Sequence, residues 1–168
     1  CLVGSEMCIR DRGMGDGKFA PDAKLTRGML VTTLYRLADE PEVTEPATFQ
    51  DVSEGRYFSD AIAWAEDVGI AKGITETHFA PDSAVTRKQA VTFLYRYVTE
   101  YLKQEATEGA DLKDYLDGHK VMDYAQTAFG WAVAEGLFEG YGDGTLRPAT
   151  TLTRAQMAKL LTILDQNF

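Results

Sequence analysis

The sequence has little cysteine or histidine and no long apolar run. Two cysteines and two histidines stand among 168 residues, and both cysteines fall within the first eight positions. No apolar stretch approaches the roughly 18 residues that a membrane-spanning helix needs, so we expect no insertion into a membrane. His78 and His119 lie 41 residues apart, and no cysteine accompanies them. This spacing argues against a metal site, and we expect neither a metal nor another cofactor.

Positive charge is also scarce. The chain has 26 acidic residues against 17 Lys and Arg, which gives a net charge of −9 and an isoelectric point near 4.7. Nucleic-acid binding relies on clustered Lys and Arg in surplus, so we expect no nucleic-acid partner. An anionic ligand would have to be held by a local group of positive charges.

Common catalytic motifs are missing as well. The sequence has no G-x-S-x-G, no phosphate-binding G-x-x-x-x-G-K and no Cys–His pair outside the first twelve residues. Carboxylates are abundant, so counting them does not decide about glycoside hydrolysis. The residues that stand out occur three times, whereas an active site needs one asymmetric constellation. We therefore expect a binding protein and not an enzyme.

The first twelve residues, CLVGSEMCIRDR, share no pattern with the rest of the chain. They resemble the translated sequencing-adapter read-through found at the ends of open reading frames assembled from environmental DNA. We expect residues 1–12 to be a non-native leader, with the natural chain truncated at its N-terminus. A genuine disordered N-terminus is the alternative.

What the sequence does contain is an internal repeat. Three segments align without a gap: Gly13–Arg27 (GMGDGKFAPDAKLTR), Gly73–Arg87 (GITETHFAPDSAVTR) and Gly140–Arg154 (GYGDGTLRPATTLTR). Gly, Pro, Thr and Arg coincide in all three. The arginines that close the segments are 60 and 67 residues apart. A repeat at this spacing indicates a small structural unit that is used several times.

Each repeated segment lies between two expected helices. Upstream, YFSDAIAWAEDVGIAKG from Tyr57 matches YAQTAFGWAVAEGLFEG from Tyr124, so that Trp64 coincides with Trp131 on an amphipathic helix. Downstream of each Thr-Arg, apolar residues recur at helical spacing. The sequence thus predicts an all-α fold of three tandem helix-loop-helix repeats.

The expected boundaries are 13–45 for the first repeat, 46–108 for the second and 109–168 for the third. The first repeat lacks its leading helix, since only the leader precedes it. We therefore expect its second helix to expose Leu30, Leu34 or Leu37, where a leading helix would have covered them.

The repeated threonines suit the first position of a helix. A Thr side chain there accepts a hydrogen bond from a backbone amide of the first turn. Gln89 and Gln156 have the spacing of a capping box, in which the Gln reaches back to the cap residue, whereas Met29 cannot do this. The expected N-caps are Thr26, Thr86 and Thr153.

The arginine after each threonine needs a different explanation. A cation in the first turn opposes the helix dipole, so Arg27, Arg87 and Arg154 suggest another use. Free backbone amides at a helix N-terminus attract anions, and a guanidinium beside them adds a fork that fits a carboxylate or phosphate. Alternatively, each arginine pairs with a nearby acidic residue and only joins neighbouring repeats.

The combined pattern resembles the S-layer homology domain. It comprises an F-x-D opening at Phe49 and Asp51, a Trp-bearing helix, G-x-F-x-P with Phe79 and Pro81, and a closing Thr-Arg. The resemblance covers residues 13–168 and implies a pseudo-threefold, trimer-like helical bundle with three prongs. The sequence departs from the family in lacking the Glu of Thr-Arg-Ala-Glu. In the third repeat, we expect Leu112-Lys113-Asp114 to replace the F-x-D opening.

This resemblance also implies a function. Such domains attach proteins noncovalently to a secondary cell wall polysaccharide, often one whose mannosamine-type sugar carries a pyruvate ketal. It therefore implies the C-terminal module of a larger secreted surface protein, located outside the cell at the wall or surface layer, with surface-layer proteins as neighbours. The alternative function is a helical-repeat surface for protein–protein interaction or surface-layer assembly.

The candidate ligand-binding residues are Arg27, Arg87, Arg154, Trp64, Trp131, Gly73, Gly140 and Asp51. For the two tryptophans, a place in the core is the alternative.

Overall fold

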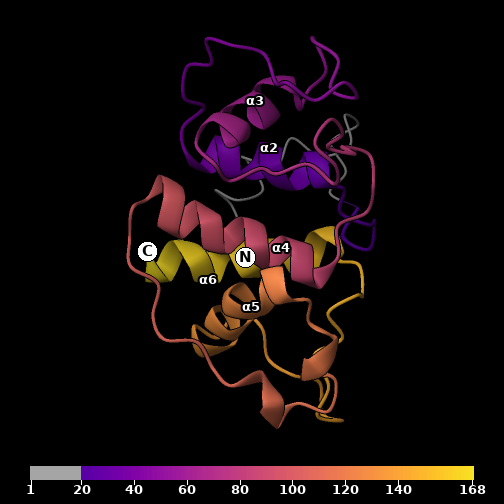
Figure 1. Ribbon diagram of the computed structural model, residues 1–168, viewed down its shortest axis with the longest axis vertical. Helices are drawn as coiled ribbons and strands as arrows, with labels where there is room; N and C mark the ends of the chain where they lie inside the picture. The colour runs from indigo at the N-terminus through magenta and orange to yellow at the C-terminus, as the bar shows by residue number, and fades with distance from the viewer. Residues whose placement is uncertain (1–19) are drawn as a thin grey trace.

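The computed structural model describes residues 20–168, and it is built from helices and loops (Figure 1). The expectations for residues 1–12 and for the start of the first repeat lie outside the described residues. Within them, β-pairing is limited to isolated bridges, and the predicted all-α fold is confirmed. The α-helices are α2 (Arg27–Leu37), α3 (Ser59–Asp67), α4 (Arg87–Arg96), α5 (Asp123–Ala134) and α6 (Arg154–Asn167). Three short helical turns are η1 (Tyr97–Tyr101), η2 (Leu112–Asp114) and η3 (Gly118–Lys120).

The helices pack in pairs that cross the repeat boundaries. Helix α2 packs against α3 and α4 packs against α5 (Figure 1), so the leading helix of one repeat covers the second helix of the repeat before it. Leu30 and Leu34 are 0% exposed for this reason. The expectation that the first repeat exposes its leucines is wrong for Leu30 and Leu34, because their cover comes from the following repeat. Leu37 is half-buried against the core.

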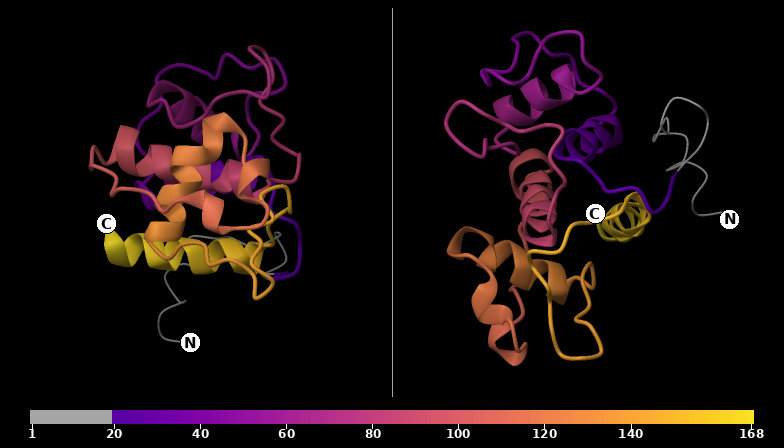
Figure 2. Two further views of the ribbon diagram at one scale, coloured as in Figure 1. Left: turned by 60° about the horizontal axis from the view of Figure 1, so that its bottom comes forward. Right: turned by 90° about the vertical axis from the view of Figure 1, so that its right-hand side faces the viewer.

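The last helix lacks such a partner in the described part of the chain. No described helix packs on α6 as α3 packs on α2, and Figure 2 shows α6 standing to one side of the α4–α5 pair. Its inner face nevertheless joins the shared core through Met157, Leu160, Leu161 and Leu164. Among the helices of residues 20–168, none has both the length and the apolar composition of a membrane-spanning segment.

Three backbone hydrogen bonds join the three repeats in a closed triangle. The amide of Leu25 donates to the carbonyl of Leu152 at 2.8 Å, Leu152 donates to Val85 at 3.0 Å, and Val85 donates to Leu25 at 2.9 Å. These apolar residues each precede a Thr-Arg step, and all three side chains are buried. Equivalent residues thus meet around one axis, which is the arrangement that a pseudo-threefold bundle requires.

An aspartate fixes the loop of the second repeat. The carboxylate of Asp51 accepts hydrogen bonds from the amides of Phe79 at 2.8 Å and Ala80 at 2.6 Å. Ala80 has a φ of +59°, in the left-handed region that non-glycine residues rarely adopt. The two hydrogen bonds offset the cost of this conformation. Asp51 is thus a structural residue of the loop.

The third repeat has the same arrangement around a different aspartate. Asp117 accepts from the amides of Leu146 at 2.6 Å and Arg147 at 2.8 Å, and Arg147 has a φ of +50°. The opening of this repeat is therefore 115–117 (Tyr-Leu-Asp), with its aromatic residue kept, and the expectation of an opening at 112–114 is wrong. Asp51 precedes its first amide partner by 28 residues, whereas Asp117 precedes its partner by 29. An alignment of the two repeats without a gap therefore does not place Asp117 opposite Asp51.

Candidate functional site

Each second helix begins directly after a threonine. In α2 the hydroxyl of Thr26 accepts from the amide of Met29 at 3.2 Å. In α4 and α6 the side chain of the third helical residue also reaches back: Gln89 accepts from the Thr86 amide, and Gln156 from the Thr153 amide, each at 3.0 Å. These caps fix the position of the arginine that follows.

The first amides of these helices are not free. The amide of Arg27 donates to the carbonyl of Ser83 at 3.0 Å, and that of Gly28 donates to Pro81 at 2.8 Å. The equivalent bonds elsewhere are Arg87 to Thr150, Lys88 to Pro148, Arg154 to Ala23 and Ala155 to Pro21, at 2.8–3.1 Å. The hypothesis that an anion binds to free amides beside the arginine is therefore wrong, since loop carbonyls of another repeat already occupy them.

The side chain of Arg27 lies between the first and second repeats. It is 4% exposed, and it donates from Nε to the carbonyl of Phe79 at 2.8 Å and from Nη2 to that of Lys72 at 3.1 Å. Its Cζ lies 4.4 Å from the centre of the Phe79 ring and 5.2 Å from that of Phe93. Burial lowers the pKa of Arg27 to about 10, so the guanidinium stays charged at neutral pH.

Arg87 occupies the corresponding place between the second and third repeats. It is 6% exposed, and its Nη2 lies 3.5 Å from the carbonyl of Glu139. Its Cζ is 4.0 Å from the Phe138 ring and 5.2 Å from the Tyr141 ring. Burial lowers the pKa of Arg87 as well. Arg154 is likewise buried, with 4% exposed.

A groove with a volume of about 580 Å³ opens beside Arg27. We call it the Arg27 groove, and four of its lining side chains are cationic: Arg27, Lys72, Lys88 and Arg96. No Asp or Glu lines it. In a chain of net charge −9, this is the local group of positive charges that an anionic ligand would need.

All three repeats contribute to the Arg27 groove. Arg27 comes from the first repeat, residues 72–74 and α4 from the second, and Met122 and Tyr124 from the third. The exposed apolar side chains at its rim are Ile74, Met122 and Tyr124, which are 57%, 54% and 51% exposed. The groove therefore combines fixed positive charge with apolar surface.

Electrostatics couple the aromatic rim to the cations. Burial raises the pKa of the Tyr124 phenol, against the opposing fields of Arg27 and Arg96. Burial lowers the pKa of Arg96, whose Nη1 donates to the carbonyl of Ile70 at 3.3 Å. Both guanidinium groups are thus held by carbonyls at the groove and not by carboxylates.

Gly73 and Gly140 lie where a side chain has no room. A Cβ on Gly73 would overlap the carbonyl oxygen of Thr75 and come within 2.8 Å of the Phe49 ring, and one on Gly140 would meet the Tyr115 ring at 2.5 Å. Gly73 also lines the Arg27 groove.

The tryptophans are far less accessible than a ligand platform needs. Trp64 is 4% exposed and Trp131 is 0% exposed, and they pack against Tyr35 at 5.5 Å and Tyr95 at 5.6 Å between ring centres. This corrects their inclusion among the ligand-binding candidates: with both faces covered, the rings belong to the core. Their positions on the apolar face of a helix were the signal for this alternative.

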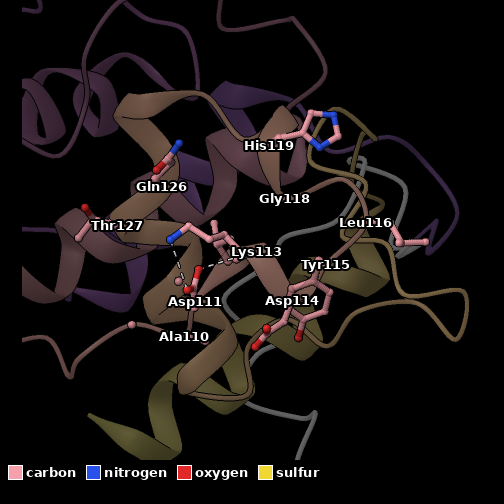
Figure 3. Close-up of a pocket in the computed structure, with 13 residues that line it drawn as sticks. Ala110, Asp111, Lys113, Asp114, Tyr115, Leu116, Gly118, His119, Gln126 and Thr127 are labelled. Atoms are coloured by element: carbon pink, nitrogen blue, oxygen red, sulfur yellow. Dashed lines mark hydrogen bonds and ion pairs between the residues drawn. The ribbon is translucent and has the colours of Figure 1, made fainter.

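A larger cavity, of about 850 Å³, lies beside the start of the third repeat (Figure 3). Lys113, the one Lys or Arg among its described lining residues, lies 3.7 Å from the carboxylate of Asp111, to which Figure 3 shows it turned. Asp114 adds a second carboxylate to the wall. His119 lines another part of the wall. The described residues contain no group of three or more metal-ligating side chains. The Arg27 groove is therefore the better candidate for binding an anion.

Comparison with known families identifies two matching segments. The family described as S-layer homology domain matches residues 48–91 and 114–158. The two matches begin three residues before Asp51 and Asp117, respectively, in agreement with the equivalent roles of these aspartates in the structure.

Several curated proteins are similar to most of the chain. A cellulosome-anchoring protein of Acetivibrio thermocellus is 29% identical over 157 residues, which is 89% of this chain and 34% of that protein. A surface-layer 125 kDa protein of Lysinibacillus sphaericus is 30% identical over 93% of this chain and 13% of its own length. An endoglucanase of Bacillus sp. is 30% identical over 87% of the chain and 15% of its own length. The chain thus spans about a third or less of these relatives.

Proposed function

Because the chain belongs to the S-layer homology domain family, we propose that it anchors its protein to the cell wall by binding an anionic wall polysaccharide in the Arg27 groove. The family and the names of the relatives place the chain at the cell surface, outside the cell. The identity of the ligand, a polymer whose sugars carry a carboxylate such as a pyruvate ketal, is our inference.

The observation that supports this proposal is the charge of the groove. Four cationic side chains line it without a carboxylate among them, although acidic residues outnumber basic ones in the chain by 26 to 17. Charges in a partly shielded groove act more strongly than the same charges in open water. An anion is therefore attracted here in spite of the negative charge of the whole chain.

The rim suits a sugar as the carrier of that negative charge. Ile74, Met122 and Tyr124 present apolar surface beside the cations, and Tyr124 offers both a ring face and a hydroxyl. A pyranose ring packs its C–H face against such surfaces while its polar groups reach hydrogen-bonding side chains. The arginines act here as fixed charges behind the groove, with Lys72 and Lys88 nearer to the solvent.

Sedimentation with purified cell walls tests the proposal. We expect Lys72→Gln together with Lys88→Gln to weaken the sedimentation at least about tenfold, and added salt to weaken that of the wild-type chain. The matched control is Lys103→Gln with Lys120→Gln, which removes the same charge from exposed residues outside the groove. Equal sedimentation of the two double variants would reject the groove as the binding site.

The alternative is a surface that binds protein, and the same assay separates the two. Walls stripped of their secondary polysaccharide but not of their proteins should no longer bind the chain. Undiminished binding to stripped walls would favour a protein receptor. Catalysis is no part of the proposal, since the similarity to the endoglucanase concerns only 15% of that enzyme.

A further inference from the structure

Two of the three repeated arginines, Arg27 and Arg87, have matching carbonyl partners. Arg27 donates from Nη2 to the carbonyl of Lys72 at 3.1 Å, and Arg87 has its Nη2 3.5 Å from the carbonyl of Glu139. Lys72 and Glu139 are themselves equivalent, because each precedes the first glycine of its repeated segment. Both side chains are exposed. The charge beside the buried arginine is therefore reversed between the two sites.

The other cations of the Arg27 groove are also absent from the equivalent positions. Lys88 and Arg96 stand one and nine residues after Arg87; the same steps from Arg154 lead to Ala155 and Ile163. The Arg27 groove thus has three cations in addition to its arginine. At the Arg87 site the three equivalent residues are Glu139, Ala155 and Ile163, and none of them is cationic.

The cation that the Arg87 site does gain is already neutralised. Arg147 donates from Nη2 to Asp143 at 2.7 Å, and its Cζ lies 4.0 Å from the centre of the Tyr141 ring. The same ring lies 5.2 Å from the Cζ of Arg87, so both guanidinium groups lie near one ring. Tyr141 takes the position of Ile74 at the rim of the Arg27 groove.

The remaining charge near Arg87 is negative. Asp117 acts on the Arg87 guanidinium electrostatically while it holds the amides of the loop. Asp51 plays the same part for Arg27, so this carboxylate is common to both sites and does not distinguish them. The difference between the sites lies in the positions of Lys72, Lys88 and Arg96.

We propose that the two sites differ in specificity: the Arg27 groove accepts an anionic sugar and the Arg87 site rejects it. Of the three positions that differ, the Lys72/Glu139 position decides, because only there is the charge reversed. This inference depends on the proposed function, because it concerns the same class of ligand. It assigns Lys72 as a specificity-determining residue and Glu139 as the residue that repels the anion. An electrostatic difference of this kind selects between ligands more than it strengthens binding in general.

Calorimetric titration of the chain with a defined sugar tests the inference. The probe is the methyl glycoside of pyruvylated N-acetylmannosamine, and the same glycoside without the ketal is its neutral counterpart. We expect the affinity of the charged probe for the chain to be at least about tenfold lower in Lys72→Glu. Glu139→Lys should raise the wild-type stoichiometry by up to one site per chain. In the double variant, binding should move to the Arg87 site.

Two controls test whether the variants stay folded and whether the effect depends on the position of the charge. Both side chains are exposed, so the unfolding midpoints of the variants should equal that of the wild type. Lys120→Glu and Glu45→Lys reverse single exposed charges outside the Arg27 groove, and they should leave affinity and stoichiometry unchanged.

Two results would overturn the inference: full affinity in Lys72→Glu, or an unchanged stoichiometry in Glu139→Lys. Wall sedimentation distinguishes this failure from that of the proposed function. If the wild-type chain sediments with walls and Lys72→Glu does so equally, only the specificity is wrong. If the wild-type chain does not sediment, the anchoring function itself is wrong.

Discussion

The guanidinium of Arg27 lies 4.4 Å from the centre of the Phe79 ring and donates a hydrogen bond to the carbonyl of the same residue at 2.8 Å. The repeated arginine is therefore first a connection between repeats. Its charge contributes to the groove from a buried and fixed position, and its loss would affect folding and binding together.

Arg27→Lys tests this structural role. A single ammonium cannot donate to the carbonyls of both Phe79 and Lys72 while it covers the ring, and a buried acceptor without a partner costs about 1–3 kcal/mol. We expect the free energy of unfolding in urea to fall by about this amount. Arg56→Lys, at an exposed position, is the control and should be close to neutral. Wild-type stability in Arg27→Lys would contradict the role of Arg27 as a connection between repeats.

Asp51→Asn should destabilise the protein in a pH-dependent way. Burial alone would raise the pKa of Asp51, but the hydrogen bonds from Phe79 and Ala80 outweigh it, so the pKa is lowered from its ordinary 3.8. A lowered pKa in the folded state means that the carboxylate contributes stability above the ordinary pKa. This contribution is lost as the pH falls through the folded-state value.

At pH 7 the Asn variant should therefore unfold about 1–3 kcal/mol more easily, since its amide group replaces one acceptor by a donor. The difference from the wild type should shrink when urea unfolding is repeated below pH 3.8. Asp82→Asn, at an exposed position, serves as the control. A difference that is constant with pH would show that charge plays no part.

Gly73→Ala should damage the loop beside the groove. The added Cβ would overlap the carbonyl oxygen of Thr75 and press on the Phe49 ring, and such overpacking costs about 1–3 kcal/mol. We expect a lower thermal midpoint. Gly142→Ala is the matched control, because a Cβ there would meet no atom within 4 Å. Equal midpoints for the two variants would disprove the close approach.

Ala80→Gly should stabilise the protein. Ala80 has a φ of +59°, which costs a non-glycine residue about 1–2 kcal/mol, and glycine adopts this conformation freely. The greater entropy of glycine in the unfolded chain offsets part of the gain. We expect a net rise in unfolding free energy of about 0.5 kcal/mol, whereas Ala149→Gly, in a loop without such a φ, should lower it. A lower unfolding free energy in Ala80→Gly would show that the positive φ of Ala80 does not strain the backbone.

The sequence predicted the class of fold because its repeats contain the local signals of helices. Thr86 and Gln89 indicate where α4 begins, and the apolar spacing indicates which face is buried. The sequence did not show which helix covers which. The burial of Leu30 and Leu34 depends on contacts between repeats, and helical periodicity does not reveal the partner of an apolar face.

The site was harder to predict for a similar reason. The residue type of Arg27 and its place in the repeat were evident, but its carbonyl partners come from residues 45 and 52 positions away. The sequence did not predict the other residues of the groove, which are Lys72, Lys88 and Arg96 from the second repeat and Tyr124 from the third. No sequence motif connects them. One signal was present: Lys72 and Glu139 differ in charge at equivalent positions.

The triangle of Leu25, Val85 and Leu152 has a mechanical consequence. Each member holds both others, so the first and last repeats are joined as directly as consecutive ones. A chain nicked within the surface linker at 41–47 would stay in one piece, because the connection between repeats does not depend on that linker. A force applied to any one repeat therefore acts on both of its neighbours. We expect the three repeats to unfold together under load and not one after another.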